Sequence, residues 1–363
     1  MKKKTNTRRI VNSSKTLRAT RITMGIDQHA KFLVVVMQYD NGAPLPAVRI
    51  ASDKFLEWIK KLREYAKEIH ACYEAGPCGF VLHRQLMELG IKSRVVRPRK
   101  LDREGRGVKT DRLDARQLCV DLHQYLGGDL RILGVIRVPS VEEEESRSVT
   151  RFRQQLVEDR KRHQAQGFSK LLAAGIYYRG AWWKPAPWAR ISLKVSASLK
   201  EQLEILREMI EKLQERIDKI TRVIEQEAGT LPRGVGALSH ETLRREVGSW
   251  DRFKNRDQVG SLAGLCPGIA SSGESRREGS ITKHGNPRMR QVLVEMAWRL
   301  LFHQPDYRGT KKFLKRLKSN PGSRAWRKKG IVALARELAV DLWRLNTKQT
   351  TAEKLGLVML EKK

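Results

Sequence analysis

Four acidic residues in the first third of the chain have the types and spacing of a divalent metal site. Asp27 and Glu74 each end a short apolar stretch, and Asp111 and Asp114 open a segment with helical character. Because Asp111 and Asp114 are three residues apart, their carboxylates lie on one face of that helix and can share a cation. Oxygen ligands without a nearby His or Cys cluster suit Mg²⁺ or Mn²⁺. Two such ions, roughly 3.5–4 Å apart, would stabilise the attacking and leaving oxygens of a phosphodiester displacement.

Each acid taken alone also has a purely structural explanation. Polar residues commonly end strands, and an Asp in the first turn of a helix interacts favourably with the helix dipole. The four acids together, in a chain with 73 Lys and Arg against 40 Asp and Glu, favour the metal site.

An α/β scaffold is needed to bring the four acids together. Short apolar runs predict strands at 22–27, 31–38, 47–51, 69–74 and 93–96. Apolar residues at helical spacing predict helices at 52–62, with Ser52 or Asp53 as N-cap, at 80–89 and at 111–126. This order predicts a sheet of mixed direction, in which side chains at strand ends meet at one edge.

A second group of reactive residue types lies in the last third of the chain. Ser271 and Ser272 precede a glycine on a flexible turn, and five cationic residues follow closely in sequence: Arg276, Arg277, Lys283, Arg288 and Arg290. A serine hydroxyl is a weak nucleophile that needs a base, a metal or cations to attack a phosphate. Such an attack on DNA would leave a phosphoserine link that conserves the bond energy for re-ligation. The residues alone favour the alternative, a surface loop that only binds phosphates.

The composition indicates a nucleic-acid partner. The 363 residues carry a net charge of +33, and the sequence pI is about 10.4. A polyanion such as nucleic acid would offset this charge, whereas no apolar run is long enough to span a membrane. The four cysteines match neither a zinc pattern nor a disulfide framework, and we expect a cytoplasmic protein with reduced thiols. The first 20 residues are expected to be a basic, disordered arm.

A long helix is predicted between the two groups of reactive residues. Leu and Ile recur at three- and four-residue steps from Leu199 to Ile224, which predicts a coiled-coil-like helix that pairs with a partner. Packing of this helix within its own chain is equally compatible with the pattern. Ahead of it, Trp182, Trp183 and Trp188 lie among basic residues, where they could stack on RNA bases or pack in a core.

Blocks of sequence around the four acids resemble a known family. GIDQHAK (25–31), YEAGPCGFVLHRQLMELG (73–90), VVRP (95–98) and VKTDRLDARQL (108–118) resemble the DEDD-type domain of a family of bacterial insertion-sequence transposases, the bridge-RNA-guided recombinases. The resemblance implies a RuvC-like, RNase H-like fold with four catalytic metal ligands: Asp27, Glu74, Asp111 and Asp114. We expect Lys109 and Arg112, in the last block, to contact nucleic acid, together with the cations near the serines: Arg276, Arg277, Lys283, Arg288 and Arg290.

The serine segment resembles the C-terminal transposase domain of the same family. The block GLCPGIASSGESRREGSITKHGNPRMRQVLVEMAW (264–298) implies that Ser272, or failing that Ser271, is the nucleophile. Ile269 and Ala270 stand where an aromatic residue often precedes the serines. LPRGVGALSHETL (231–243) resembles a helix–hairpin–helix element whose turn can present backbone N–H groups to phosphates, although Arg233 interrupts the usual PGVG.

The sequence therefore predicts five segments. They are a basic arm (1–20), a RuvC-like domain (21–135), a helical linker with a coiled coil (136–228), a mostly helical C-terminal domain (229–346) and a tail (347–363).

The function that we expect is that of an insertion-sequence recombinase. It would cut and rejoin donor and target DNA with Mg²⁺ (or Mn²⁺) and Ser272, guided by a bridge RNA, as a homodimer or tetramer. The alternatives are a junction-resolving nuclease without serine chemistry and a non-catalytic nucleic-acid-binding protein.

Overall fold

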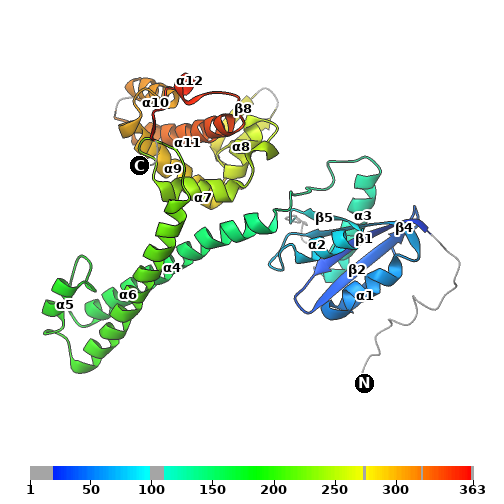
Figure 1. Cartoon of the computed structure of the whole chain (residues 1–363), viewed down its shortest axis with the longest axis horizontal. Coiled ribbons are helices and arrows are strands. Elements are labelled where there is room, and N and C mark those ends of the chain that lie inside the picture. The colour runs from blue at the N-terminus through cyan, green and yellow to red at the C-terminus, as the bar shows by residue number, and fades with distance from the viewer. Residues whose placement is uncertain (1–18, 99–109, 273–274, 320–321, 361–363) are drawn as a thin grey trace. The chain divides into compact units, whose positions relative to one another are not determined.

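The chain forms two compact units (Figure 1). The computed structural model describes residues 19–98, 110–272, 275–319 and 322–360. The first unit covers Met1–Val138 and the second covers Pro139–Lys363. The expected basic arm lies outside the described residues except for Ala19 and Thr20, which begin the first strand.

A five-stranded mixed sheet forms the centre of the first unit, as the sequence predicts. Its strands are β1 (Ala19–Gln28), β2 (Phe32–Tyr39), β3 (Val48–Ala51), β4 (Ala66–Glu74) and β5 (Lys92–Val96), in the order β3-β2-β1-β4-β5. The first three strands are antiparallel neighbours, while β1–β4 and β4–β5 are parallel pairs. The carboxyl ends of β1 and β4 therefore meet at one edge of the sheet.

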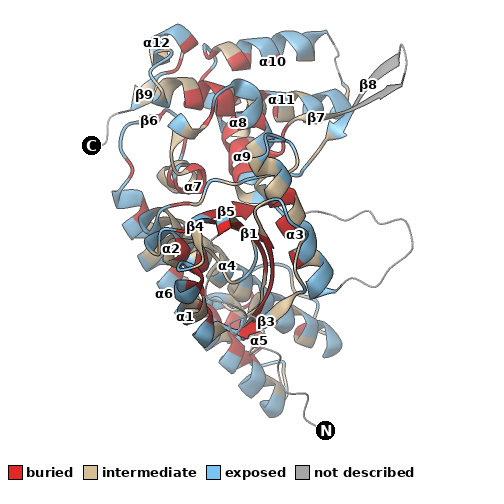
Figure 2. Ribbon diagram, turned by 90° about the vertical axis from the view of Figure 1, so that its right-hand side faces the viewer, coloured by how far each residue is buried: buried red, intermediate tan, exposed pale blue. Residues whose placement is uncertain are grey.

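Helices cover both faces of this sheet, and most of its buried side chains lie at their contacts (Figure 2). On one face, α1 (Ser52–Leu62) and α2 (Val81–Glu88) pack on alternate residues of β1 such as Met24. On the other face, Ala115 and Cys119 of α3 (Asp111–Leu126) pack against β2. The N-cap of α1 is Ala51, without a side-chain cap, rather than Ser52 or Asp53. The Ser52 hydroxyl instead donates to the Ala30 carbonyl.

A helical hairpin begins the second unit. Its helices are α4 (Val141–Ala173), the short α5 (Pro185–Ile191) and α6 (Ala197–Gln226). The long helices run antiparallel, because Arg153 donates to Thr221 over 2.7 Å and Lys170 donates to Gln202 over 2.6 Å. The Leu/Ile row of α6 is buried where α6 lies on α4, at Leu203, Leu206, Ile210, Ile217 and Ile224. The partner of the predicted helix is therefore α4 of the same chain.

The tryptophans before α6 form a small core. Trp182 is fully buried, and its indole N–H donates to the Gln164 carbonyl over 3.0 Å. Its ring lies directly on Gly167, where an added Cβ would come within 1.8 Å of Cζ2. Trp188 is also buried, and Trp183 packs edge-on against Trp182. These rings therefore pack in a core, one of the two roles that the sequence left open.

The rest of the second unit is mostly helical, as predicted. Its elements are β6 (Leu231–Pro232), α7 (Ala237–Val247), the 3-10 turn η2 (Trp250–Arg252), α8 (Arg256–Ala263), β7 (Pro267–Ser272), β8 (Ser275–Ile281), α9 (Pro287–His303), α10 (Arg308–Lys318), α11 (Arg324–Asn346), α12 (Ala352–Leu355) and β9 (Met359–Leu360). The glycine- and serine-rich segment expected to be a flexible turn is a β-hairpin, β7–β8. None of the described helices is long and apolar enough to cross a membrane.

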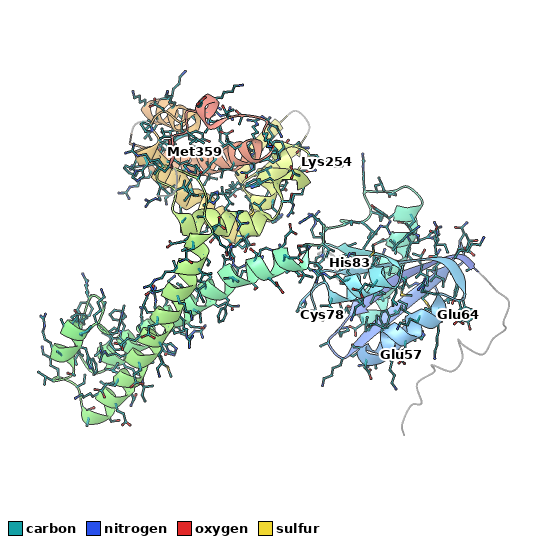
Figure 3. The ribbon with its side chains drawn as sticks, viewed as in Figure 1. Glu57, Glu64, Cys78, His83, Lys254 and Met359 are labelled. Carbon is teal, nitrogen blue, oxygen red and sulfur yellow. The ribbon has the colours of Figure 1, made fainter. Side chains whose placement is uncertain are left out.

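The segment expected to be a tail packs on the second unit. Leu355 and Leu357 are buried in its core, and Met359 of β9, labelled in Figure 3, pairs with Pro232 of β6. The fold therefore uses this segment to hold the turn before α7.

Candidate metal centre and serine hairpin

Strand register places two of the four predicted acids side by side. Ile26 of β1 is paired with Tyr73 of the parallel strand β4, so the next residues, Asp27 and Glu74, lie at adjacent strand ends. Side chains alternate between the faces of a strand, which puts Asp27 on the face of Gly25 and Glu74 on that of Cys72. This is the face that α3 covers.

Gly25 sets the distance between α3 and the sheet. A Cβ at this position would lie 2.2 Å from the Ala115 carbonyl oxygen and 2.3 Å from the Cys119 nitrogen. Only a residue without a side chain allows this approach of two backbones. The close packing brings the first turn of α3, with Asp111 and Asp114, to the end of β1.

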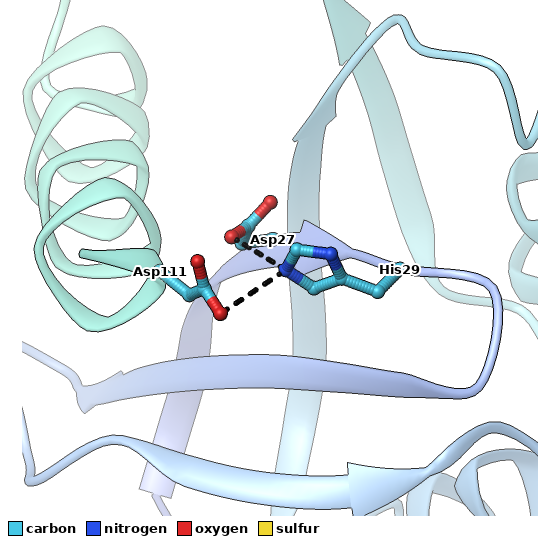
Figure 4. A group of neighbouring side chains, drawn as sticks. All are labelled: Asp27, His29 and Asp111. Atoms are coloured by element: carbon cyan, nitrogen blue, oxygen red, sulfur yellow. Dashed lines mark hydrogen bonds and ion pairs between the residues drawn. The ribbon is translucent and has the colours of Figure 1, made fainter. Parts of the chain in front are cut away.

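His29 bridges the carboxylates of Asp27 and Asp111 (Figure 4). Its Nε2 lies 3.1 Å from Asp27 Oδ2 and 3.3 Å from Asp111 Oδ2. Asp111 is half exposed and Asp27 is 26% exposed, so the group opens to solvent on one side. His29 is not among the site residues predicted from the sequence, although it lies in the GIDQHAK block. Its position two residues after Asp27 is the sequence feature that could have identified it as part of the site.

Burial and neighbouring carboxylates raise the pKa of Asp27. Burial is the largest cause, Asp111 and Asp114 add negative charge that raises the pKa further, and His29 opposes these effects. Asp114 is therefore electrostatically part of the group. A cation between the acids would remove the repulsion that raises this pKa.

The donors present suit a divalent metal ion. One ligand atom each from Asp27, His29 and Asp111 lies within 4.8 Å of the others. Two carboxylates and an imidazole can bind Mn²⁺, and the carboxylates with water can bind Mg²⁺. The strand register puts Glu74 at the strand end next to Asp27, but neither Glu74 nor Asp114 belongs to the group of ligand atoms within 4.8 Å. Of the four predicted acids, the structure therefore brings Asp27 and Asp111 together there.

A hollow of about 620 Å³ adjoins this group. It is lined by Asp111 and by two cationic residues, Arg49 and Arg112, together with Phe32 and Thr110 among others. The Arg49 guanidinium lies 3.5 Å above the centre of the Phe32 ring, and His29 stacks on the same ring. Arg112, a predicted nucleic-acid contact, thus lies beside Asp111, and Arg49, which was not predicted, lines the same hollow. Lys109 lies outside the described residues.

The serines lie at the end of a β-hairpin. Ser271 is paired with Arg276, and Ser272 with Ser275, across β7 and β8. The side chains of residues 269–278, which include Arg277, lie outside the described part of the structure. The backbone therefore puts both serines next to the turn of the hairpin.

Gly285 and Arg290 anchor the base of this hairpin. A Cβ at Gly285 would lie 2.2 Å from the Gly264 nitrogen, so the chain needs glycine where it passes α8. Arg290 donates to the carbonyls of Ala263 and Lys283 over 3.1 and 3.3 Å. This predicted nucleic-acid contact thus positions the hairpin within the chain.

Asn286 ties the start of α9 to the buried carboxylate of Glu246. Its side chain caps the helix by accepting from Arg288 and Met289, and its amide donates to Glu246 over 2.7 Å. Glu246 is fully buried and is paired with Arg151 of α4 over 2.8 Å. Lys283 is exposed and Arg288 is half-buried, so of these two predicted contacts Lys283 is the more accessible.

The predicted helix–hairpin–helix turn uses some of its amides internally. The Arg233 N–H donates to the Val358 carbonyl and the Val235 N–H donates to the Pro232 carbonyl. Gly234 between them has a φ of +87°, which favours glycine. These two N–H groups are therefore occupied within the chain rather than presented to phosphate.

Known proteins match both units. The DEDD transposase family model covers residues 24–174, and the model described as Transposase IS116/IS110/IS902 family covers residues 230–312. The y4rJ protein of Sinorhizobium fredii, named as a transposase, is 30% identical over 355 residues, 87% of this chain and 89% of the relative. The chain belongs to the IS116/IS110/IS902 transposase family.

Other relatives in this transposase family are named for insertion sequences. The transposase for IS1533 of Leptospira borgpetersenii is 25% identical over 343 residues, 89% of this chain and 94% of the relative. The transposase for IS1111A of Coxiella burnetii is 25% identical over 300 residues, 77% and 79% of the two chains. Membership makes the chain an enzyme that acts on DNA, with an RNase H-like fold and a divalent metal in its DEDD domain.

Proposed function

We propose that this transposase cuts and rejoins DNA with Mg²⁺ at its acidic group and with Ser272 as nucleophile. The observation that supports the metal site is the meeting of Asp27, His29 and Asp111 within 4.8 Å at the sheet edge. We propose Glu74 and Asp114 as further ligands, because β4 and the first turn of α3 lead to the same edge.

The acids and the adjoining hollow have distinct roles in this proposal. When bound, Mg²⁺ would polarise a phosphoryl oxygen and offset the charge that develops during displacement. Asp27 and Asp111 would hold the ion, and His29, whose Nε2 contacts both carboxylates, would orient them. Arg49 and Arg112 line the hollow beside Asp111 and would pair with flanking phosphates of the bound strand.

The serine provides the covalent step. Attack by the Ser272 hydroxyl would form an oxygen–phosphorus bond, break the bond between phosphorus and the leaving DNA oxygen, and transfer a proton to that oxygen. Rejoining is the reverse reaction with a hydroxyl from another strand. The position of Ser272 beside a hairpin turn supports access to a substrate, and cations that follow it in sequence would stabilise the charge on the phosphate.

We extend the proposal to guidance by an RNA and to a dimer or tetramer. Base pairing of a bridge RNA with donor and target DNA would select the sequences, while the protein contacts backbones. The net charge of +33 is sufficient to hold more than one nucleic-acid strand. Exchange between two DNAs requires several active sites. Two measurements test these points. Cleavage that depends on the RNA encoded beside the gene tests guidance, and the mass of the active complex tests the number of subunits.

Trapping of a covalent protein–DNA adduct tests the serine. We expect the unmodified protein with Mg²⁺ to yield an adduct that Ser272→Ala abolishes and Ser271→Ala retains. Asp27→Asn is expected to abolish both cleavage and adduct. Cleavage by Ser272→Ala without an adduct would refute the serine mechanism while leaving the metal site intact.

A junction-resolving nuclease is the second candidate, because the acidic group lies entirely within the first unit and requires no serine for hydrolysis. It predicts cleavage with water as nucleophile and full activity in Ser272→Ala. Absence of any Mg²⁺-dependent cleavage, with nucleic-acid binding unchanged in both Asp27→Asn and Asp111→Asn, would instead leave a non-catalytic nucleic-acid-binding protein.

A further inference from the structure

A cationic groove lies between α8, α10 and α11 of the second unit, away from the serine hairpin in sequence. The hollow has a volume of about 460 Å³, and six cationic side chains line it: Arg256, Arg308, Lys312, Arg316, Arg336 and Arg344. Its acidic residues are Glu337 and Asp341. Even when Asp257, which pairs with Arg336, is included, cations exceed acids by three.

Buried contacts hold part of this groove in a fixed geometry. Asp341 is fully buried and accepts from the Tyr307 hydroxyl over 2.8 Å and from Arg308 Nε over 2.9 Å. Lys312 pairs with Glu337 over 2.8 Å, one helical turn later in α10 and one turn earlier in α11 than Arg308 and Asp341. The guanidinium of Arg308 is thus oriented before any ligand arrives, which lowers the entropic cost of binding an anion.

An aromatic hollow continues the groove. It has a volume of about 150 Å³ and shares Arg316 and Ala333 with the cationic hollow. Trp326 on its wall is 49% exposed, and the Lys329 ammonium lies 5.9 Å from the centre of its ring. Such exposure is unusual for a tryptophan and points to a planar ligand.

Glycine at position 330 shapes the floor of the aromatic hollow. A Cβ there would lie 2.6 Å from Cε2 of Phe313, so the buried Phe313 ring packs directly on the backbone of α11. The two hollows therefore belong to one face of the α10–α11 pair.

We propose that this groove binds a single-stranded nucleic acid, with phosphates along the cations and one unpaired base stacked on Trp326. Single-strand sites combine a positive groove with aromatic platforms, because every base has a face to stack. A duplex would engage the cations but would keep its bases paired. This inference goes beyond the proposed cleavage chemistry and does not depend on the role of Ser272.

Binding measurements on the full chain test the proposal without any cleavage. The probes are labelled single strands of DNA and of RNA, each of about 16 nucleotides, and a DNA duplex of equal length. Trp326→Ala is expected to weaken single-strand binding about 10-fold, with Trp326→Phe close to the unmodified protein and duplex binding unchanged. Phe302→Ala, which removes a ring that is 78% exposed on α9, is the matched control and leaves all affinities unchanged.

The cations are tested through the dependence of affinity on salt. Arg256→Ala with Arg316→Ala is expected to lower the slope of log affinity against log salt by about 1.4 for single strands. The control pair is Arg216→Ala with Lys219→Ala, exposed cations of α6 that lie outside the groove, and it leaves the slope unchanged. Thermal unfolding of each variant checks that the fold is retained.

A photo-crosslink measures the base contact independently of total affinity. A single strand with 5-iodouracil is expected to crosslink to the peptide that contains Trp326. If only the DNA strand or only the RNA strand crosslinks, that result identifies the nucleic acid that the groove binds. The proposal is overturned if neither strand crosslinks there, if Trp326→Ala weakens the duplex equally, or if the control pair lowers the slope as much.

Discussion

Substitution of Gly25 by alanine tests whether the packing of α3 on β1 sets the metal centre. The new Cβ would lie 2.2 Å from the Ala115 carbonyl oxygen, whereas ordinary contact begins near 3.4 Å, so α3 must withdraw by about 1.2 Å. All three obstructing atoms, the Ala115 oxygen and the nitrogen and Cα of Cys119, belong to the backbone, so no side-chain rotation relieves the contact. Overpacking of this kind costs about 1–3 kcal/mol of folding stability. The shift carries Asp111 away from Asp27, and a misplacement of about 1 Å costs roughly 100-fold in activity.

Two measurements on Gly25→Ala separate these effects. Thermal unfolding reports the loss of stability, and titration with Mn²⁺ followed by electron paramagnetic resonance reports the affinity of the metal centre. Gly229→Ala is the matched control, because no atom lies within 4 Å of a Cβ at that position. A Gly25→Ala protein with unchanged unfolding temperature and unchanged Mn²⁺ affinity would refute the role assigned to this contact.

Three further substitutions probe the site and its supports. His29→Ala is expected to weaken Mn²⁺ binding about 10- to 100-fold, because the two carboxylates lose their bridging partner; tighter binding in the titration would show that His29 blocks the ion. Burial raises the pKa of Glu246, but bonds from Arg151 and Asn286 outweigh it and lower the pKa below 4.5. The stability that this carboxylate contributes is therefore present above pH 4.5 and lost as the pH falls through its folded pKa. Glu246→Gln should flatten the acid limb of denaturant midpoints measured against pH, and an unchanged limb would contradict this. Gly167→Ala should displace the Trp182 ring, lower stability by about 1–3 kcal/mol and reduce the near-ultraviolet circular dichroism; an unchanged spectrum would argue against the contact.

Local pattern was sufficient to predict the sheet and to select Asp27 and Asp111, the two acids that the structure brings together. The Val-rich run of β2 and the helical spacing after Asp111 are strong signals within a few residues, and α3 has the predicted bounds Asp111–Leu126. The acids could be selected because each lies where an element begins or ends. Their number and the basic composition then favoured a metal site.

Contacts between distant parts of the chain could not be predicted in this way. The role of Gly25 depends on Ala115 and Cys119, ninety or more residues later, and that of His29 depends on Asp111. The spacing of Leu and Ile in α6 defines a buried face but does not identify α4 as its partner. The β7–β8 hairpin has little apolar alternation, so its strands were not visible in the sequence.

The length of α4 has a mechanical consequence. Its 33 residues rise about 1.5 Å each, so the helix is about 50 Å long. One turn of duplex DNA advances about 34 Å. α6 packs along α4, and the small core around Trp182 fixes the end of the hairpin that the two helices form. The α4–α6 hairpin is therefore a stiff element rather than a flexible linker. Contacts made at its two ends would fall on different turns of a duplex lying along it, and a deletion of matched turns from α4 and α6 would shorten that separation in steps of about 5.4 Å.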